Sequence, residues 1–216
     1  MLPLKLELGR RRTLEVLCLG AHCDDIEIGC GATLMRLVKE QPVRVTWVIM
    51  SSTAKRAAEA RKSAALFLRQ AKAARVQIEA FRDGFLPAHW NDVKERFEEL
   101  KRLPRPDVVF THERDDRHQD HRVVCELTWN TFRDHLILEY EIPKFDGGMG
   151  QPNLYVPVTA ALTERKSRHL LSAYRSQGKK TWFSAETFRG LMRLRGIESN
   201  AGDGFAEAFH ARKAVL

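Results

Sequence analysis

Six side chains that can bind a metal or move a proton fall into two short segments of this 216-residue sequence. They are His22, Asp24 and Asp25 in the first segment and His118, Asp120 and His121 in the second. Imidazole nitrogens and carboxylate oxygens are ordinary zinc ligands, and both groups also serve as general acids and bases. The two segments together are therefore candidates for a hydrolytic metal site.

Each polar segment follows an apolar run that is typical of a β-strand. Residues 14–20 and 107–111 are rich in aliphatic and aromatic side chains and end abruptly at polar residues. In an open parallel sheet, ligands bind outside the carboxyl ends of the strands. We therefore predict that the two segments meet at one edge of a sheet.

Strands and helices alternate along most of the chain, which favours a mostly parallel α/β sheet flanked by helices. Further strands are predicted at residues 43–50, 76–81, 136–142 and 154–159. Helices are predicted at 29–41, 54–74, 91–103, from about residue 122, at 164–176 and 185–195, with one more short helix in the tail. Because no repeat or linker divides the chain, we expect a single domain over residues 1–216.

His22, Asp25 and His121 can supply two nitrogen ligands and one oxygen ligand to one metal ion. Two histidines, one carboxylate and an open fourth position are typical of a catalytic zinc site. Asp24 points away from its neighbour Asp25 yet stays close, so it can take a proton from metal-activated water. His118 can stabilise a developing oxyanion or protonate a leaving amine. This pattern predicts metal-assisted hydrolysis.

Each of these residues also has a structural interpretation when it is taken alone. A single histidine is more often a surface or core residue than a ligand, and Asp24, Asp25 or Asp120 can simply cap the helix that follows. Two clusters at predicted strand ends favour the metal site over these alternatives. Gly29-Cys30-Gly31 is not a phosphate loop, because position 34 is Leu34 rather than a third glycine and no P-loop Lys-Ser/Thr follows.

Composition excludes several other classes of protein. No stretch approaches the roughly 20 apolar residues of a membrane span. The N-terminus carries Lys5, Glu7 and Arg10–Arg12 before its apolar segment, unlike a secretory signal. The four cysteines form no CxxC pair, so we expect reduced thiols, with Cys18 and Cys125 in the core, and a cytoplasmic location.

The formal net charge of +8 is spread over most of the predicted helices. The nearest approaches to a cluster are Arg10–Arg12 and the stretch 165–180. A solvated basic surface is the first interpretation, and attraction to an anionic sugar nucleotide, glycolipid or membrane surface is the second. A basic, non-enzymatic nucleic-acid-associated protein is an alternative that charge alone favours, because no recognition motif accompanies it.

Ala21-His22-Cys23-Asp24-Asp25, followed by Gly29-Cys30-Gly31, resembles the A-H-P-D-D signature of the PIG-L/LmbE-like de-N-acetylases. His118-Gln119-Asp120-His121 resembles the family's second signature, H-P-D-H or H-x-D-H. The likeness extends over most of the chain, through Phe110-Thr111-His112 and Tyr174-Arg175-Ser176-Gln177 to the tail at 206–209. Because the two motifs lie about 95 residues apart, their pairing is specific.

The resemblance implies a Rossmann-like fold and a zinc-dependent enzyme that removes an N-acyl group, commonly acetyl, from an amino sugar. The implied roles are metal ligands for His22, Asp25 and His121, general base for Asp24, oxyanion stabiliser or general acid for His118, and orientation of a histidine for Asp120. The implied cofactor is Zn²⁺ or another divalent metal. The expected partner is a small N-acetylated sugar, sugar nucleotide or glycolipid, and not a nucleic acid.

One position departs from the family pattern, because Cys23 stands where a proline is usual. Proline would stiffen the turn through its fixed φ. We expect Cys23 to be a tolerated small residue rather than a fourth ligand. A metal-dependent hydrolase of another bond, such as a phosphoester, is the alternative that keeps the metal and changes the reaction.

Overall fold

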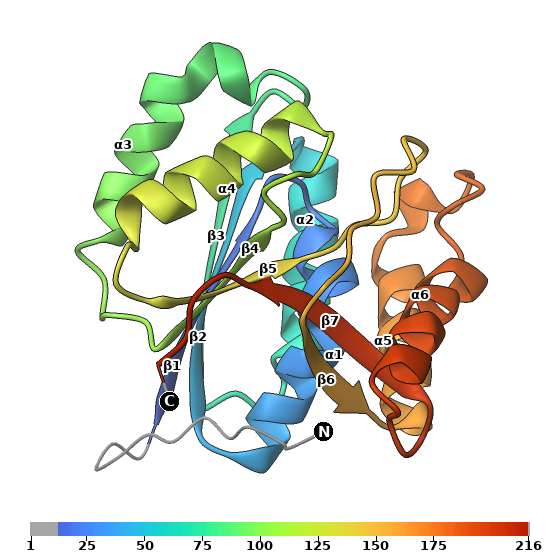
Figure 1. Ribbon diagram of the computed structural model, residues 1–216. Coiled ribbons are helices and arrows are strands. Elements are labelled where there is room, and N and C mark those ends of the chain that lie inside the picture. Colours follow the sequence, from blue (N-terminus) through green and yellow to red (C-terminus); the bar gives the residue numbers. More distant parts are fainter. Residues whose placement is uncertain (1–12, 216) are drawn as a thin grey trace.

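Seven strands form one sheet, in the order β3-β2-β1-β4-β5-β7-β6, in the computed structural model, which describes residues 13–215 (Figure 1). The strands are β1 (Leu14–Gly20), β2 (Val43–Ser51), β3 (Ala73–Phe81), β4 (Val108–His112), β5 (Leu136–Tyr140), β6 (Leu154–Val158) and β7 (Phe205–Ala211). The helices are α1 (Asp25–Glu40), α2 (Ala54–Phe67), α3 (Trp90–Leu100), α4 (Gln119–Thr131), α5 (Ala160–Ala173) and α6 (Ala185–Glu198). Short 3₁₀ turns lie at Leu86–His89 and Arg175–Gln177.

The first five strands are parallel, and the last two are antiparallel to their neighbours. β1 pairs with β2 on one side and with β4 on the other, and both pairings are parallel. β7 runs antiparallel to β5 and β6. The chain leaves β1 toward β2 and returns to its other side at β4, so the two carboxyl ends flank the point where the strand order reverses. Ligands bind at such a point in open α/β sheets.

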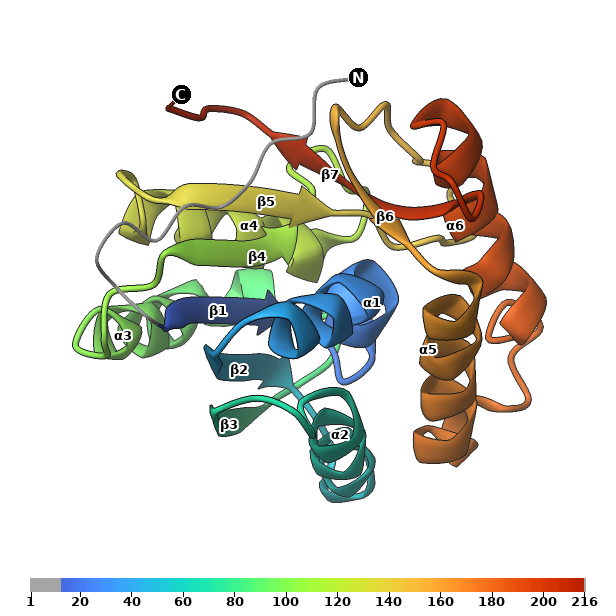
Figure 2. The ribbon, with the colours of Figure 1, turned by 90° about the horizontal axis from the view of Figure 1, so that it is seen from below.

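Two cores cover the two faces of the sheet. Side chains of α1, α2 and α5 pack on one face with Val16 and Cys18 of β1. Side chains of α3 and α4 pack on the other face with Leu17 and Leu19. Successive strand residues point to opposite faces of a sheet. Because helices cover both faces of β1, nearly all of its side chains are buried and its sequence is a nearly continuous apolar run. Figure 2 shows this arrangement from below.

The predicted α/β architecture is confirmed, and several element boundaries are corrected. α1 begins at Asp25 rather than at residue 29, so Asp25 lies in the first turn of the helix and Asp24 stands at the N-cap position before it. α4 begins at Gln119 rather than near residue 122, because the imidazole of His118 accepts a hydrogen bond from the Asp120 amide and caps it. The alternative in which Asp120 merely caps this helix is therefore excluded. α5 begins four residues early, at Ala160.

The long helix predicted at 54–74 is wrong in its last two turns, residues 68–74. α2 ends at Phe67, and residues 73–75 pair with β2 as the start of β3. Hydrogen bonding to a neighbouring strand outweighs the helix propensity of the alanines there.

The short helix predicted in the tail is also wrong, because residues 205–211 form strand β7. Ala206, Glu207 and Ala208 favour a helix by propensity, yet β7 is inserted between β5 and β6 and is buried along most of its length. Pairing on both edges decides its conformation. A strand at this place completes the sheet beyond β5.

The four cysteines are free and buried, as predicted for Cys18 and Cys125. Among residues 13–215, no helix combines the length and apolar character needed to span a bilayer. The predicted basic cluster at Arg10–Arg12 lies outside the described residues. The second basic stretch is not uniformly exposed, because Lys166 within it is buried.

Candidate metal centre

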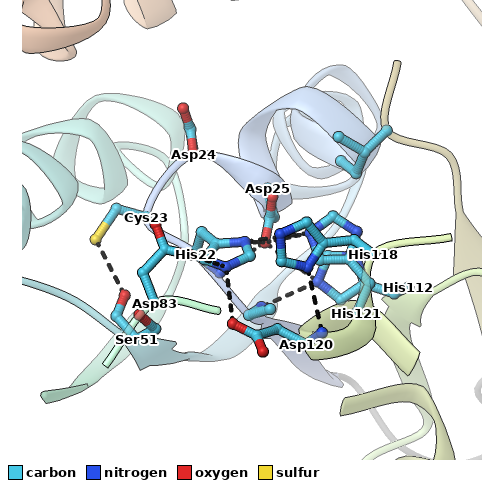
Figure 3. Close-up of polar contacts among 12 residues, drawn as sticks. His22, Cys23, Asp24, Asp25, Ser51, Asp83, His112, His118, Asp120 and His121 are labelled. Atoms are coloured by element: carbon cyan, nitrogen blue, oxygen red, sulfur yellow. Dashed lines mark hydrogen bonds and ion pairs between the residues drawn. The ribbon is translucent and has the colours of Figure 1, made fainter. Parts of the chain in front are cut away.

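The two polar segments meet at the carboxyl ends of β1 and β4, as predicted. Parallel pairing of the two strands aligns Cys18 with Phe110, so the residues that follow each strand emerge side by side. The turn after β1 presents His22 and Asp25, and the first turn of α4 presents His121 (Figure 3). The topology therefore assembles one cluster from residues about a hundred positions apart.

His22, Asp25 and His121 place three ligand atoms in a small triangle. Nδ1 of His22 lies 3.2 Å from Nε2 of His121 and 3.4 Å from Oδ2 of Asp25. Nε2 of His121 lies 3.6 Å from the same carboxylate oxygen. Ligand atoms at zinc-bonding distance in a tetrahedral site are about 3.3–3.4 Å apart. The donor set and the size of the triangle both fit a zinc ion.

The second nitrogen of each of these histidines faces a carboxylate. Nε2 of His22 lies 3.2 Å from Oδ2 of Asp120, and Nδ1 of His121 lies 2.9 Å from Oδ2 of Asp116. Asp120 also accepts hydrogen bonds from the amides of Gly84 and Leu86, so its own position is well determined. Such carboxylates set the orientation and tautomer of histidines that bind metal. The predicted place of Asp120 beside a histidine agrees with this geometry.

Charges around the triangle favour an ionised carboxylate on Asp25, a neutral imidazole on His121 and a protonated imidazole on His22. Burial alone would raise the pKa of Asp25, but the facing His121, His112 and His22 hold it well below its usual range. Burial, with a contribution from His112, lowers the pKa of His121 to about 3. Burial also acts to lower the pKa of His22, yet nearby carboxylates, above all that of Asp25, raise it. A cation bound there would displace the His22 proton, so the affinity of the site for the cation would rise with pH.

Sequence reasoning missed Asp116, which links three parts of the site. Its carboxylate contacts the His121 ring, accepts the His118 amide at 2.7 Å and accepts Nζ of Lys144 at 2.5 Å. Burial tends to raise the pKa of Asp116, but His121 and Lys144 outweigh it and lower that pKa. Lys144 belongs to the long loop after β5, so no local pattern could have paired the two residues.

His112, the last residue of β4, belongs to the family likeness in the sequence, but sequence reasoning gave it no role at the site. Its Nε2 accepts the Ala21 amide at 2.9 Å and lies 3.2 Å from Oδ2 of Asp25, and its ring stacks on His121 with centroids 3.8 Å apart. Because the Ala21 amide occupies the Nε2 lone pair, this nitrogen of His112 supports Asp25 and His121, and the buried Nδ1 of the same ring has no hydrogen-bond partner among the described residues. A histidine at the very end of a buried strand was the signal available in the sequence.

Asp24 points in a different direction from Asp25. Figure 3 shows its carboxylate turned away from the imidazole rings, and Oδ1 forms an ion pair with Nη2 of Arg56 at 3.0 Å. Its side chain makes no capping hydrogen bond to α1, so the capping interpretation is wrong for this residue. Burial raises the pKa of Asp24 even though Arg56 opposes that change. A raised pKa makes a carboxylate a stronger base.

His118 lies beside the triangle and is half-buried. Its ring is 4.8 Å from the ring of His22 and 4.6 Å from that of His121, measured between centroids. Its Nδ1 accepts the Asp120 amide at 3.2 Å, which directs the other side of the ring outward. Burial, followed by the charge on His22, lowers its pKa.

Cys23 faces away from the cluster. Its thiol points to the carbonyl of Ser51 at 3.7 Å, on the opposite side of the turn from the histidines (Figure 3). Burial raises the pKa of this thiol to about 12, so it is protonated at neutral pH. A cysteine binds metal as a thiolate, and the thiol of Cys23 is protonated and directed away from the triangle of His22, Asp25 and His121.

The glycines after the first segment serve close packing. A Cβ at Gly29 would lie 2.2 Å from the Tyr140 ring, and one at Gly31 would lie 2.5 Å from the Phe67 ring. α1 can therefore approach β5 and α2 only because these positions lack side chains. This agrees with the exclusion of a phosphate loop.

Around the cluster, several donor atoms form overlapping groups that could each hold a cation. Within each group the atoms lie within 4.8 Å of one another. The groups are His22 with His118 and His121, Asp25 with His112 and His121, and His22 with Asp83 and Asp120. Asp83 is mostly exposed, and its Oδ1 lies 3.1 Å from Nε2 of His22. It therefore lies at the exposed edge of the cluster.

Comparison with solved structures shows the same fold in several proteins. The conserved protein TT1542 from Thermus thermophilus is 23% identical, with a TM-score of 0.72 over 94% of this chain and 96% of that one. The N,N'-diacetylchitobiose deacetylase from Pyrococcus horikoshii is 22% identical, with a TM-score of 0.66 over 91% and 82% of the two chains. The 4-carboxy-2-hydroxymuconate hydratase from Pseudomonas putida is 14% identical, with a TM-score of 0.74 over 94% and 98%.

A family model described as GlcNAc-PI de-N-acetylase matches residues 17–132. This range includes both polar segments, the second half of β1, all of β4 and the helices α1 and α4 that follow. The match covers more than half of the sequence, and the chain therefore belongs to the PIG-L family.

Proposed function

We propose that this protein is a metal-dependent deacetylase that hydrolyses the N-acetyl group of an amino sugar or its conjugate. The observation that carries the proposal is the triangle of His22, Asp25 and His121, whose sides of 3.2–3.6 Å suit one tetrahedral metal ion. Membership of the PIG-L family supports acetyl transfer to water as the reaction. One deacetylase of similar fold acts on N,N'-diacetylchitobiose, which supports an N-acetylated sugar as the substrate class.

In this proposal His22, Asp25 and His121 hold Zn²⁺ or another divalent metal. The ion would supply Lewis acidity at the amide carbonyl and lower the pKa of a water molecule. Asp120 and Asp116 keep the two imidazoles in the orientation and tautomer that leave one nitrogen free for the metal. The protein thereby provides an ordered site before any ligand arrives.

The remaining groups move protons and stabilise charge. Asp24 accepts the proton of the attacking water, and burial strengthens it as a base while Arg56 holds its carboxylate in place. His118 faces the reacting carbonyl from the other side, where it stabilises the oxyanion or delivers a proton to the departing amine. Water adds to the carbonyl carbon, the C–N bond breaks, and acetate and a free amine leave in equal amounts.

Polar residues at the exposed edge of the cluster can bind the hydroxyl groups of a sugar ring. Asp83 is exposed and can accept hydrogen bonds from hydroxyls, and the adjacent Arg82 stacks on the ring of Phe85 at 3.7 Å. Asp83 and Arg82 therefore offer an acceptor and donors for the hydroxyl groups of a sugar at this edge. The reduced cysteines of the chain support a site of action in the cytoplasm.

Metal analysis combined with an amine-release screen tests the proposal. Purified protein is loaded with zinc, freed of excess metal and offered N-acetylglucosamine, N,N'-diacetylchitobiose, N-acetylated sugar nucleotides and N-acetylglucosaminyl lipids. We expect bound metal close to one equivalent and release of acetate and amine in a 1:1 ratio. Well-folded protein without bound metal or amine release would contradict the proposal, and phosphate release from a phosphoester in place of amine would favour the alternative hydrolase.

A further inference from the structure

Lys166 of α5 and Glu207 of β7 form a buried ion pair against the middle of α1. Nζ of Lys166 lies 2.6 Å from Oε1 of Glu207, and each side chain is only 2% exposed. Removing two charges from water is costly, and the attraction between them repays the cost only when their remaining donors and acceptors are also satisfied. The other partners of this pair are therefore informative.

Both members of the pair bond to the backbone of α1. Nζ of Lys166 donates to the carbonyl of Ile28 at 2.5 Å, and the Glu207 carboxylate accepts the amides of Ala32 and Thr33 at 2.9 and 2.6 Å. Ile28 and Ala32 are four residues apart, so this carbonyl and this amide are the natural partners of one helical step. Lys166 thus bonds the carbonyl and Glu207 bonds the amide of one i to i+4 pair near the start of the helix.

α5 holds the same helix at a second point, close to its start. The hydroxyl of Tyr174, which follows α5, lies against the carbonyl of Cys23 and, at 2.5 Å, the carboxyl of Glu27. The turn that carries Asp25 lies between this contact and the Ile28 carbonyl. Lys166 of α5 and Tyr174, directly after α5, therefore contact the chain on both sides of the turn that carries Asp25.

We propose that the Lys166–Glu207 ion pair is a positioning device that places Asp25 relative to the two histidines and thereby sets the affinity for metal. The inference rests on the proposed function, because it takes the triangle to be the metal site. Asp25 lies three residues before Ile28, within one turn of the anchored carbonyl. Metal–ligand distances tolerate only about 0.2 Å of variation, so a small shift of this turn weakens binding.

A second buried ion pair provides a matched control on the same side of the sheet. Arg195 of α6 bonds Glu141 at 2.6 Å, and its other hydrogen bonds go to Glu198 and to the carbonyl of Gly150. It resembles the first pair in burial and in chemistry. It differs because it bonds to α6 and the loop after β5 rather than to the backbone of α1.

Glu207→Gln and Glu141→Gln separate positioning from simple stability. The dissociation constant for zinc alone is measured on metal-stripped protein by competition with a coloured chelator, and urea unfolding is measured in parallel. Both variants lose stability, because Glu207→Gln leaves the buried Lys166 without its carboxylate and Glu141→Gln leaves Arg195 with the carboxylate of Glu198 alone. We expect zinc affinity to fall about tenfold or more in Glu207→Gln and to change less than about twofold in Glu141→Gln.

A double variant, Lys166→Met with Glu207→Gln, covers the case in which Glu207→Gln does not fold. It removes both charges together, which buried ion pairs often tolerate, and it still abolishes the bond to the Ile28 carbonyl. We expect it to unfold near the wild-type urea midpoint and to bind zinc about tenfold more weakly.

Equal zinc affinity in the wild type and the double variant overturns the inference, and so does an equal loss in Glu207→Gln and Glu141→Gln. Each of these results leaves the proposed function intact, because the wild type still binds zinc and releases amine. A wild type that binds no zinc overturns the proposed function and this inference with it.

Discussion

Nδ1 of His22 lies 3.2 Å from Nε2 of His121, although 99 residues separate the two histidines. Oδ2 of Asp25 lies within 3.6 Å of both atoms. Two imidazole nitrogens can share one hydrogen at that distance, but the carboxylate adds a negative charge opposite both. The triangle is thus an arrangement that a divalent cation stabilises more than a proton does.

Replacing His121 by Ala removes one corner of the triangle. We expect the zinc affinity to fall about a hundredfold or more, because one of three protein ligands is lost. Chelator competition on metal-stripped protein measures the change. His89→Ala is the control, because His89 is exposed on the 3₁₀ turn before α3. Zinc binding of His121→Ala at the wild-type level would exclude this residue as a ligand.

Asp24→Asn and Asp25→Asn are both expected to lose turnover, but for different reasons. Asp25→Asn removes the charged ligand, so both metal content and turnover fall. Asp24→Asn keeps the metal within about twofold and lowers kcat by roughly 10²- to 10⁴-fold, the usual contribution of a general base. Metal content and amine release are measured on the same samples. Turnover of Asp24→Asn at the parent rate would remove Asp24 from the base role.

Cys23→Ala is expected to leave zinc affinity unchanged within about twofold, because the thiol points to Ser51 and burial raises its pKa to about 12. The same metal titration measures this. A large loss of zinc affinity, or a cobalt-substituted protein whose thiolate charge-transfer band disappears in the variant, would instead make Cys23 a ligand.

Glu27 makes stability depend on pH. Burial raises the pKa of this carboxyl from 4.5 to about 8, so between these values the native state keeps a proton that the unfolded chain has lost. The unfolding free energy therefore falls as pH rises through this window, by an amount on the order of 3–5 kcal/mol.

Glu27→Gln has no proton to keep, and its amide oxygen can still accept from Tyr174. Urea unfolding at pH 5 and pH 8, with chelator present, compares the two proteins. We expect the wild type to lose stability relative to the variant between those values. Parallel pH profiles would show that the carboxyl of Glu27 is not shifted in the native state.

Much of the fold was predictable because it depends on local patterns. The apolar run at 14–20 and the turn residues that follow predict a strand that ends at polar side chains, and this is what β1 does. The errors fall where distant pairing overrides local preference. Residues 73–75 belong to a strand because β2 lies beside them, and the alanines of β7 are extended because β5 and β6 hold both of its edges.

The sequence identified the residue types of the site, but it could not show which of the two adjacent aspartates faces the histidines. Asp24 and Asp25 are adjacent and identical in chemistry, and helical geometry turns them in different directions. Which of them faces the histidines depends on where β4 lies. Asp25 meets His121 because β4 runs beside β1, while Asp24 meets Arg56 of α2.

The sequence by itself determined the α/β class, the two polar segments and the chemistry that their side chains can do, because these follow from residue type and spacing. Only the tertiary structure decided that Asp116, Lys144 and His112 support the cluster and that Lys166 and Glu207 anchor the helix behind it. Each of these contacts joins segments that the chain brings together only on folding. A local sequence pattern cannot predict such contacts, because these residues come close only through the packing of the whole sheet.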